Sequence, residues 1–258
     1  MPDHSVLSRF RTRLTVAGAW DGLLARVNEQ IQMHNIMIRK GCHVDASITQ
    51  SPRKPRTRPA DEAVSDREDR EERDDEADAQ TAMQVIEVTQ PGVDSEARWV
   101  RKGGKPVLGY KQHTLVDDNG LVLAVETTAA NCHDSRPLLD LLDKANIRPG
   151  VRVHPDKAYS SQKHRAALKS RGLKNGIQDK AAKNNPLTRR QLQRNRLIAK
   201  VRYGVERTFG SQARWFNAKI LRYRGLAKAH AWHLLLAMVY NLKRLPKLFA
   251  DRRLITQT

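Results

Sequence analysis

Residues 110–128 constrain the fold of this chain more than any other stretch. YKQHTLVD (110–117) and LVLAVETT (121–128) are rich in β-branched and apolar residues, and Asp118, Asn119 and Gly120 separate them. Two such runs around a short turn that contains Asn-Gly are typical of a β-hairpin. We therefore predict two adjacent antiparallel strands here, and the rest of the fold has to be built around them.

Other elements are predicted on both sides of this hairpin. Two amphipathic helices, the first capped by Ser5 and the second over residues 20–31, precede a strand over 43–50. The elements expected after the hairpin are a helix over 134–145, a strand over 151–156, a helix from Ser160 or Ser161 to about Arg171, a short strand over 173–178, a long helix from Thr188 through Phe209, and a last helix over 226–244. This order predicts the α/β class, with a mixed sheet and helices on both of its faces. It is also the element order of a ribonuclease-H-like core.

Residues 51–83 interrupt this pattern. SPRKPRTRPA (51–60) is basic and proline-rich, and residues 61–78 contain eleven carboxylates and three arginines. A segment of that composition buries too little apolar surface to offset the entropy lost on ordering, so we predict a disordered insertion. A single solvated helix over 61–80 is the alternative. The remaining chain is expected to form a helical segment (1–36), one α/β domain (37–50 and 84–245) and a C-terminal tail (246–258).

The chain carries a formal net charge of +19. An excess of that size is typical of proteins that bind a polyanion, and nucleic acid is the partner we expect; a ribosome-associated or simply basic protein is the alternative.

Cys42 and Cys132 lack the paired spacing of a zinc site. With no signal peptide at the start, they are expected to be reduced thiols in a cytoplasmic protein. The longest apolar run, 231–242, is shorter than the roughly 20 residues that cross a membrane.

Three acidic residues stand at positions where a basic protein has little reason to keep them. Asp45 lies within the first predicted strand, Asp156 ends the strand that follows the hairpin, and Glu206 lies at the edge of the apolar stripe of a helix. Singly, Asp45 fits a solvent-facing strand position, and Glu206 fits an ordinary helix ion pair with Arg202. Together, the three match the few convergent carboxylates that hold two Mg²⁺ or Mn²⁺ ions for phosphodiester chemistry.

Five motifs occur in an order that resembles a known family. They are HVDASI (43–48), GYKQH (109–113), TTAANCHDS (127–135), HPDKAYSS (154–161) and RYGVERTFG (202–210), followed by RYRGLAKAHAWHLLLA (222–237). Together they are similar to the catalytic core of DDE transposases from bacterial insertion sequences, within the insertion sequence five group of the insertion sequence four superfamily. The resemblance implies a ribonuclease-H-like fold in which Asp45, Asp156 and Glu206 are the three catalytic acids and bind Mg²⁺ or Mn²⁺.

The same resemblance implies an activity and a partner. Family members cut double-stranded DNA at the ends of the element with a metal-activated water, and the freed 3′-hydroxyl then attacks target DNA. We accordingly expect a Mg²⁺-dependent DNA transposase that works as a homodimer in the bacterial cytoplasm, at the nucleoid. Two other functions stay open: a DNA-binding remnant without catalysis, and a nuclease on the same fold.

The chain departs from the family pattern at several positions. Ala158 stands where glycine is common, and Ala199 and Ala213 replace a tyrosine and a lysine of the family's third motif. PDHSVLSRFRTRL (2–14) resembles a segment that family members carry well inside the chain. We therefore expect an N-terminally truncated copy, in which residues 1–36 are the remnant of a preceding helical domain.

Basic and polar residues around the acids are the predicted DNA contacts. They are Lys111, His113, Lys157, Tyr159, Arg189, Arg190, Arg202 and Arg214. An exposed polar strand face is the alternative for Lys111 and His113, and packing in the core is the alternative for Tyr159. Arg194 and Arg196 extend the basic run on the same predicted helix, for which a solvated face is the alternative interpretation.

Overall fold

The computed structural model describes residues 3–34, 36, 41–55, 92–181, 186–201 and 203–255. Most of the predicted disordered insertion (51–83) lies outside the described residues, so that prediction is not tested. Arg202, one of the predicted DNA contacts, also lies outside them.

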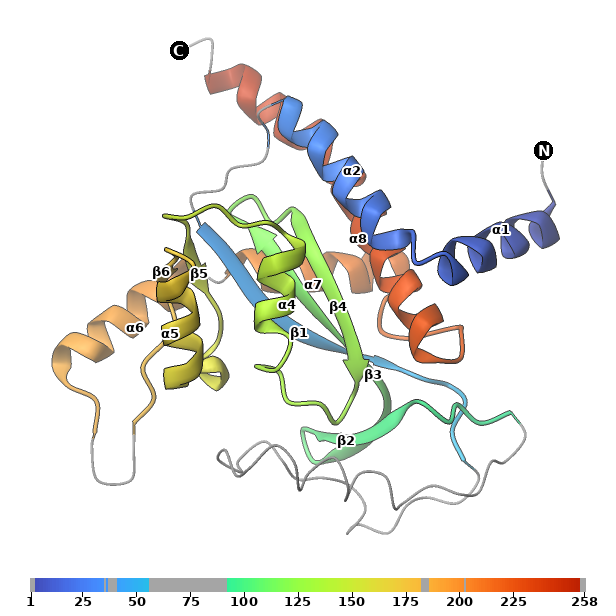
Figure 1. Cartoon of the computed structure of the whole chain (residues 1–258), viewed down its shortest axis with the longest axis horizontal. Helices are drawn as coiled ribbons and strands as arrows, with labels where there is room; N and C mark the ends of the chain where they lie inside the picture. The colour runs from blue at the N-terminus through green and yellow to red at the C-terminus, as the bar shows by residue number, and fades with distance from the viewer. Residues whose placement is uncertain are drawn as a thin grey trace.

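A six-stranded mixed sheet forms the centre of the molecule (Figure 1). Its strands are β1 (Gly41–Gln50), β2 (Arg98–Lys102), β3 (Lys105–Asp117), β4 (Val122–Ala129), β5 (Arg152–His154) and β6 (Lys174–Asn175). They lie in the order β2-β3-β1-β5-β6, with β4 paired to β3. β3 is antiparallel to β1, β2 and β4, whereas the β1–β5 and β5–β6 pairs are parallel. The predicted mixed sheet of an α/β protein is therefore confirmed.

The predicted hairpin is present as β3 and β4, but β3 begins earlier than expected. It pairs first with β2, as far as Gly109, and then with β4 from Tyr110 onward. A Cβ atom at Gly109 would lie 2.1 Å from the carbonyl oxygen of Thr49, so glycine allows β3 to pass this close to β1. β2 and β4 therefore occupy different halves of the same side of β3 (Figure 1). β2 was not predicted, because RWVRK (98–102) has only two apolar residues.

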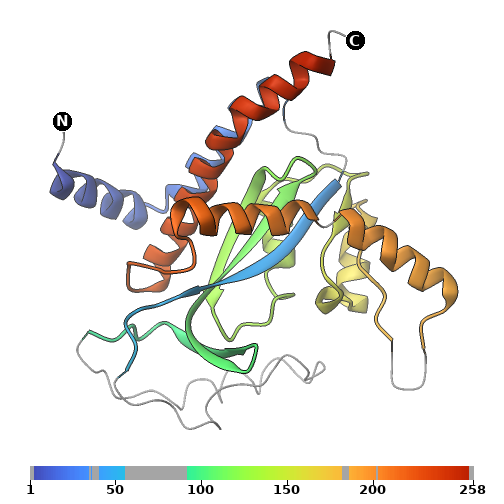
Figure 2. The same cartoon turned by 180° about the vertical axis from the view of Figure 1, so that it is seen from behind.

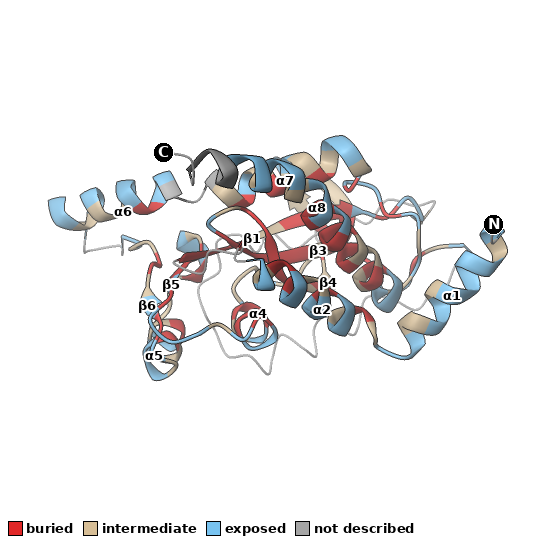
Figure 3. Cartoon of the chain, turned by 90° about the horizontal axis from the view of Figure 1, so that it is seen from above, coloured by how far each residue is buried: buried red, intermediate tan, exposed pale blue. Residues whose placement is uncertain are grey.

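Helices cover both faces of the sheet, as predicted. α4 (Leu138–Lys144) and α5 (Gln162–Ser170) lie on one face, and α7 (Tyr203–Phe216) and α8 (Leu226–Ile255) lie on the other (Figures 1 and 2). α2 (Trp20–Met33) runs along α8, α1 (His4–Val16) leads away from it, and α6 (Arg189–Val201) projects from the side of the molecule. Figure 3 shows that β1, β3 and β4 are largely buried, whereas α1 and α6 are largely exposed.

Several predicted helix boundaries are wrong. Asp3 rather than Ser5 caps α1, because the Asp3 carboxylate accepts a hydrogen bond from the Ser5 backbone N–H. The helix after the hairpin begins at Leu138 instead of residue 134, with Pro137 at its N-cap. α8 continues to Ile255, so most of the stretch assigned to a C-terminal tail (246–258) is helical.

The long helix predicted over 188–209 corresponds to α6 (Arg189–Val201) and α7 (Tyr203–Phe216), with residue 202 between them outside the described residues, and its two halves pack on different surfaces. α6 is tied to the loop after β6, where Arg194 donates a hydrogen bond to the Asp179 carboxylate at 2.8 Å. α7 rests on the sheet, where Val205 is fully buried and Gln212 accepts a hydrogen bond from Gln112 at 3.2 Å. Figure 2 shows α6 lying at an angle to α7.

Two apolar clusters hold the helices to the sheet. Buried members of the cluster under α4 and α5 include Cys42, Val44, Leu115, Leu138, Leu141, Val153 and Leu168. Buried members of the cluster under α7 and α8 include Trp20, Leu24, Val116, Val125, Val205, Leu234 and Tyr240. Because Trp20 and Leu24 belong to α2, this helix shares its core with the sheet and is not a separate unit. No helix in the described part of the chain combines the length and apolar character that crossing a membrane requires.

Candidate active site

The parallel pairing of β1 with β5 brings two of the predicted acids to equivalent positions. His43 on β1 is opposite His154 on β5, and their rings stack with centroids 5.2 Å apart. Asp45 and Asp156 each lie two residues farther along, and the backbone of Asp156 is still extended (φ −71°, ψ 170°). Side chains two residues apart on a strand point to the same face. Asp45 therefore lies on the face of the sheet that carries the stacked histidines, and Asp156 follows the end of β5, the strand next to β1.

The two histidines form a buried support beneath these acids. His43 is 1% exposed and His154 is 7% exposed. The ring Nε2 of His43 forms a hydrogen bond with the Asp118 carboxylate at 3.1 Å, which holds the pKa of Asp118 below its usual range. Burial lowers the pKa of His154 to about 4, so its ring is neutral near pH 7. The sequence analysis did not identify this pair, although the repeated His-x-Asp pattern in HVD (43–45) and HPD (154–156) is a visible signal.

α7 crosses the same face of the sheet and carries the third acid. A Cβ atom at Gly204, at the start of α7, would lie 3.9 Å from Cδ2 of His43, so the helix begins directly over the histidine support. Val205 points into the core, and Arg207 donates a hydrogen bond to the Asn119 carbonyl at 2.9 Å. Glu206 lies between them in the chain and is exposed. This arrangement leaves the carboxylate of Glu206 free of the core.

The donor atoms of the three acids suit a hard divalent cation. Carboxylate oxygens are the ligands that Mg²⁺ and Mn²⁺ prefer, and Mg²⁺ usually keeps several waters while it binds one or two carboxylates and substrate phosphates. The described residues contain no group of three or more His, Cys, Asp or Glu side chains that could hold a metal ion as they stand. The fit therefore rests on donor chemistry, because each of the three acids supplies hard carboxylate oxygens.

Five predicted DNA contacts are exposed residues or lie outside the described part. Lys157 is exposed and directly follows Asp156, whose carboxylate accepts its backbone N–H at 2.6 Å. Arg189 and Arg190 are exposed on α6, and Arg214 is exposed near the end of α7, 5.1 Å from the centroid of the Trp215 ring. Arg202 is not described. Arg194 differs from these residues, because Asp179 and nearby carbonyl groups already hold it.

The other three predicted contacts point elsewhere. Because Thr114 pairs with Asp45, its neighbour His113 points to the opposite face of the sheet, and so does Lys111. Lys111 forms an ion pair with Asp134 at 2.7 Å, and His113 is 0% exposed. Tyr159 is 1% exposed and packs in the cluster under α4 and α5. The structure corrects the prediction for His113 and Tyr159, since buried side chains offer DNA no surface.

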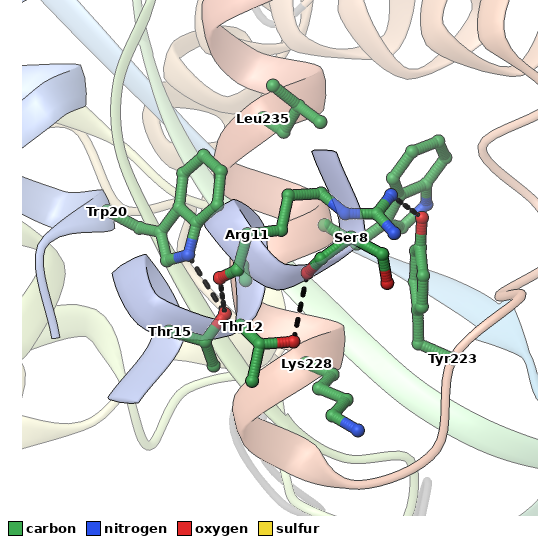
Figure 4. A pocket seen from close by; sticks show the side chains of 10 residues that line it. Ser8, Arg11, Thr12, Thr15, Trp20, Tyr223, Lys228 and Leu235 are labelled. Carbon is green, nitrogen blue, oxygen red and sulfur yellow. Dashed lines mark hydrogen bonds between the residues drawn. The ribbon is translucent and has the colours of Figure 1, made fainter. Parts of the chain in front are cut away.

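A pocket of about 90 Å³ lies apart from the acids, between α1 and α8 (Figure 4). Some of its polar groups bond one another: Arg11 donates to the hydroxyl of Tyr223, and Trp20 Nε1 donates to Thr15 Oγ1 at 3.1 Å, whereas Nε1 of Trp232 has no hydrogen-bond partner among the described residues. None of its lining residues belongs to β1, β5 or α7. We interpret it as a packing gap between helices rather than part of the acid site.

Comparison with known proteins gives the family. The family model described as the transposase DDE domain matches residues 81–242, which include Asp156 and Glu206. The chain is 36% identical over 236 residues to the transposase for insertion sequence element IS1106 of Neisseria meningitidis serogroup B, an alignment that covers 91% of this chain and 75% of that protein. It is 34% identical over 109 residues to the putative transposase for insertion sequence element IS402 of Burkholderia cepacia, covering 39% of this chain and 47% of that protein. No solved structure matches the chain. The family model and the relative with 36% identity together show that this chain belongs to the DDE transposases of bacterial insertion sequences.

Proposed function

We propose that this transposase cuts DNA at the ends of its element and joins the freed 3′ ends to target DNA, on a ribonuclease-H-like catalytic domain. The observation that carries the proposal is the β1–β5 register, which favours Asp45 and Asp156 as neighbours on one face of the sheet. Glu206 on α7 is the third acid of the proposed site. The sheet order, with antiparallel β1–β3–β4 and parallel β1–β5–β6, supports the ribonuclease-H-like assignment.

The acids and the histidines of the proposed site have different roles. Asp45, Asp156 and Glu206 would hold Mg²⁺ or Mn²⁺. When bound, the divalent ions would activate the attacking oxygen and neutralise charge on the leaving oxygen. The stacked His43 and His154 each lie two residues before one of the aspartates and would limit the movement of both carboxylates, which lowers the reorganisation needed when DNA binds.

The proposed substrate is double-stranded DNA, first at the terminal inverted repeats of the element and then at the target. The net charge of +19 supports binding to the phosphate backbone. Arg189 and Arg190 on the projecting α6, together with Lys157 beside Asp156, are the exposed cations that we assign to this contact. We further propose that the active form is a homodimer that acts at the bacterial nucleoid.

A cleavage assay with single carboxylate-to-amide variants tests the proposal. Asp45→Asn, Asp156→Asn and Glu206→Gln should each reduce strand cleavage by about a thousandfold or more in Mg²⁺, with unchanged DNA binding in EDTA. A variant that cleaves as well as the wild type would remove that residue from the site. DNA binding with no cleavage by the wild type in either Mg²⁺ or Mn²⁺ would favour the inactive remnant. Cleavage of unrelated DNA without any joined product would favour the nuclease.

A further inference from the structure

The segment after α7 returns to the sheet and fixes the backbone of one lysine. Lys219 accepts a hydrogen bond from the backbone N–H of Gln50 at 2.8 Å, and Leu221 donates one to the Gln50 carbonyl at 2.8 Å. Asn217 makes the turn into this segment with a φ of 51°. The segment therefore extends the sheet at the end of β1, and the position of Lys219 is set by main-chain bonds.

The side chain of Lys219 reaches back toward the acid site. Its ammonium donates a hydrogen bond to the hydroxyl of Ser47 at 2.7 Å. Ser47 is buried and lies two residues beyond Asp45 on β1, so both side chains are on the face that α7 covers. Lys219 as a residue is exposed. A ligand can therefore reach an ammonium group that is anchored next to the first acid.

The electrostatic setting of Lys219 differs from that of two other partly buried lysines. Lys111 bonds a carboxylate at 2.7 Å and Lys144 bonds one at 2.6 Å. The only hydrogen bond that the ammonium of Lys219 makes to described residues is to a neutral hydroxyl. Burial and the nearby Lys102 lower its pKa, and Asp45 opposes that shift. Lys219 and Lys102 are two positive groups near the one negative Asp45, and the ammonium of Lys219 bonds no carboxylate among the described residues, so a bound anion would be attracted to it.

We propose that Lys219, held by Ser47, binds a backbone phosphate of the DNA strand next to the phosphodiester that is cut. This inference rests on the proposed function, because it takes Asp45 as part of the cleavage site. Ser47 takes one of the three protons of the ammonium, and two remain to donate to phosphate oxygens. Lys102, at the end of β2, adds charge on the same side. The contact fixes the position of the strand relative to Asp45.

Replacement of single phosphates by neutral methylphosphonates tests this contact. The probes are duplexes that carry the terminal repeat beside the gene, each with one methylphosphonate, and binding is measured in EDTA. One substitution near the cut site should weaken binding by the wild type about tenfold and should not weaken binding by Lys219→Met. The salt dependence of binding by Lys219→Met should also be shallower by about one phosphate contact. Lys169→Met is the control, because this exposed lysine lies on α5 at the opposite face and should keep the full methylphosphonate effect.

The outcomes separate this contact from the proposed chemistry. If Lys219→Met responds to every methylphosphonate as the wild type does, Lys219 has only a structural role and the inference is wrong. Ser47→Ala gives a second test if Lys219→Met does not fold: it should reduce the same methylphosphonate effect, and an unchanged effect would contradict the inference. Because binding in EDTA needs no cleavage, this measurement tests the phosphate contact whether or not the acid variants lose activity.

Discussion

The two faces of strand β1 differ in chemistry, although β1 is one run of ten residues. Toward α4 and α5, Cys42 and Val44 are buried in an apolar cluster. Toward α7 and α8, the alternate residues His43, Asp45 and Ser47 are polar. This difference indicates that one face holds the fold together and the other carries the proposed chemistry. Substitutions on the two faces should therefore separate stability from activity.

A carboxylate placed on the apolar face should have the largest effect on stability. Val44 is 0% exposed and is paired with Leu115, which is also fully buried. Val44→Asp would bury an unpaired acid, and we expect the free energy of unfolding to fall by about 5 kcal/mol or more. Urea denaturation measures this change. Val44→Ala is the control and should cost only about 1–2 kcal/mol; equal effects of the two variants would show that this face tolerates charge.

Lowering the pH should destabilise both faces through buried histidines. Burial lowers the pKa of His113 to about 4 and that of His233 to about 3, whereas an exposed histidine titrates near 6.5. Below pH 6.5 these histidines therefore bind protons in the unfolded chain but remain neutral in the folded chain. The free energy of unfolding should be constant above pH 6.5 and should fall toward pH 4. His113 should account for a loss on the order of 3 kcal/mol. Denaturation curves across this range should show a shallower fall for His113→Asn; an identical fall would contradict the assignment to His113.

Loss of the carboxylate at Asp118 should have a moderate effect. Its two oxygens hold the Gly41 backbone N–H at 2.9 Å and the His43 ring at 3.1 Å. Asp118→Asn should cost about 1–2 kcal/mol in unfolding free energy, because a charge-assisted bond is lost. Cleavage should also fall by about tenfold, since the histidine support under Asp45 loosens. Asp140→Asn, on the exposed side of α4, is the matched control and should change neither value.

Neutralising the acid on the polar face should have the smallest effect on stability. Asp45→Asn keeps the size of the side chain at a partly exposed position, so we expect a change of less than about 1 kcal/mol. Strand cleavage should be lost in the same variant. Thermal unfolding and the cleavage assay, run on one preparation, measure both properties; a large loss of stability would show that Asp45 serves the fold.

The sequence was sufficient to predict the sheet where local signals were strong. The Asp118–Asn119–Gly120 turn fixed the hairpin, and Ser161 was one of two predicted caps for α5, where its hydroxyl accepts the His164 N–H at 3.1 Å. The sequence did not show that α6 and α7 lie at an angle to each other, because this angle depends on two docking surfaces that are distant in the chain. Helical periodicity continues through that point and predicts one helix.

The candidate site was only partly predictable for a related reason. Asp45 and Asp156 were predicted, but the parallel pairing of β1 with β5, which brings their strands together, is a long-range contact that no local pattern reveals. His113 was misassigned because the middle of β3 is buried on both faces, so its sequence does not alternate and does not indicate which side chains meet the acids. Lys219 could not be placed beside Asp45 either, since the return of the chain to Gln50 is a long-range contact.

The central claim is that Asp45, Asp156 and Glu206 share divalent ions at one site, and metal-directed cleavage of the protein tests it most directly. Fe²⁺ replaces Mg²⁺, ascorbate and peroxide generate hydroxyl radicals at the bound ion, and mass spectrometry maps the cuts in the chain. We expect cuts close to all three residues, suppressed by excess Mg²⁺ and lost together in Asp45→Asn. Cuts confined to other segments, or a cut at Glu206 that persists in Asp45→Asn, would contradict a shared site.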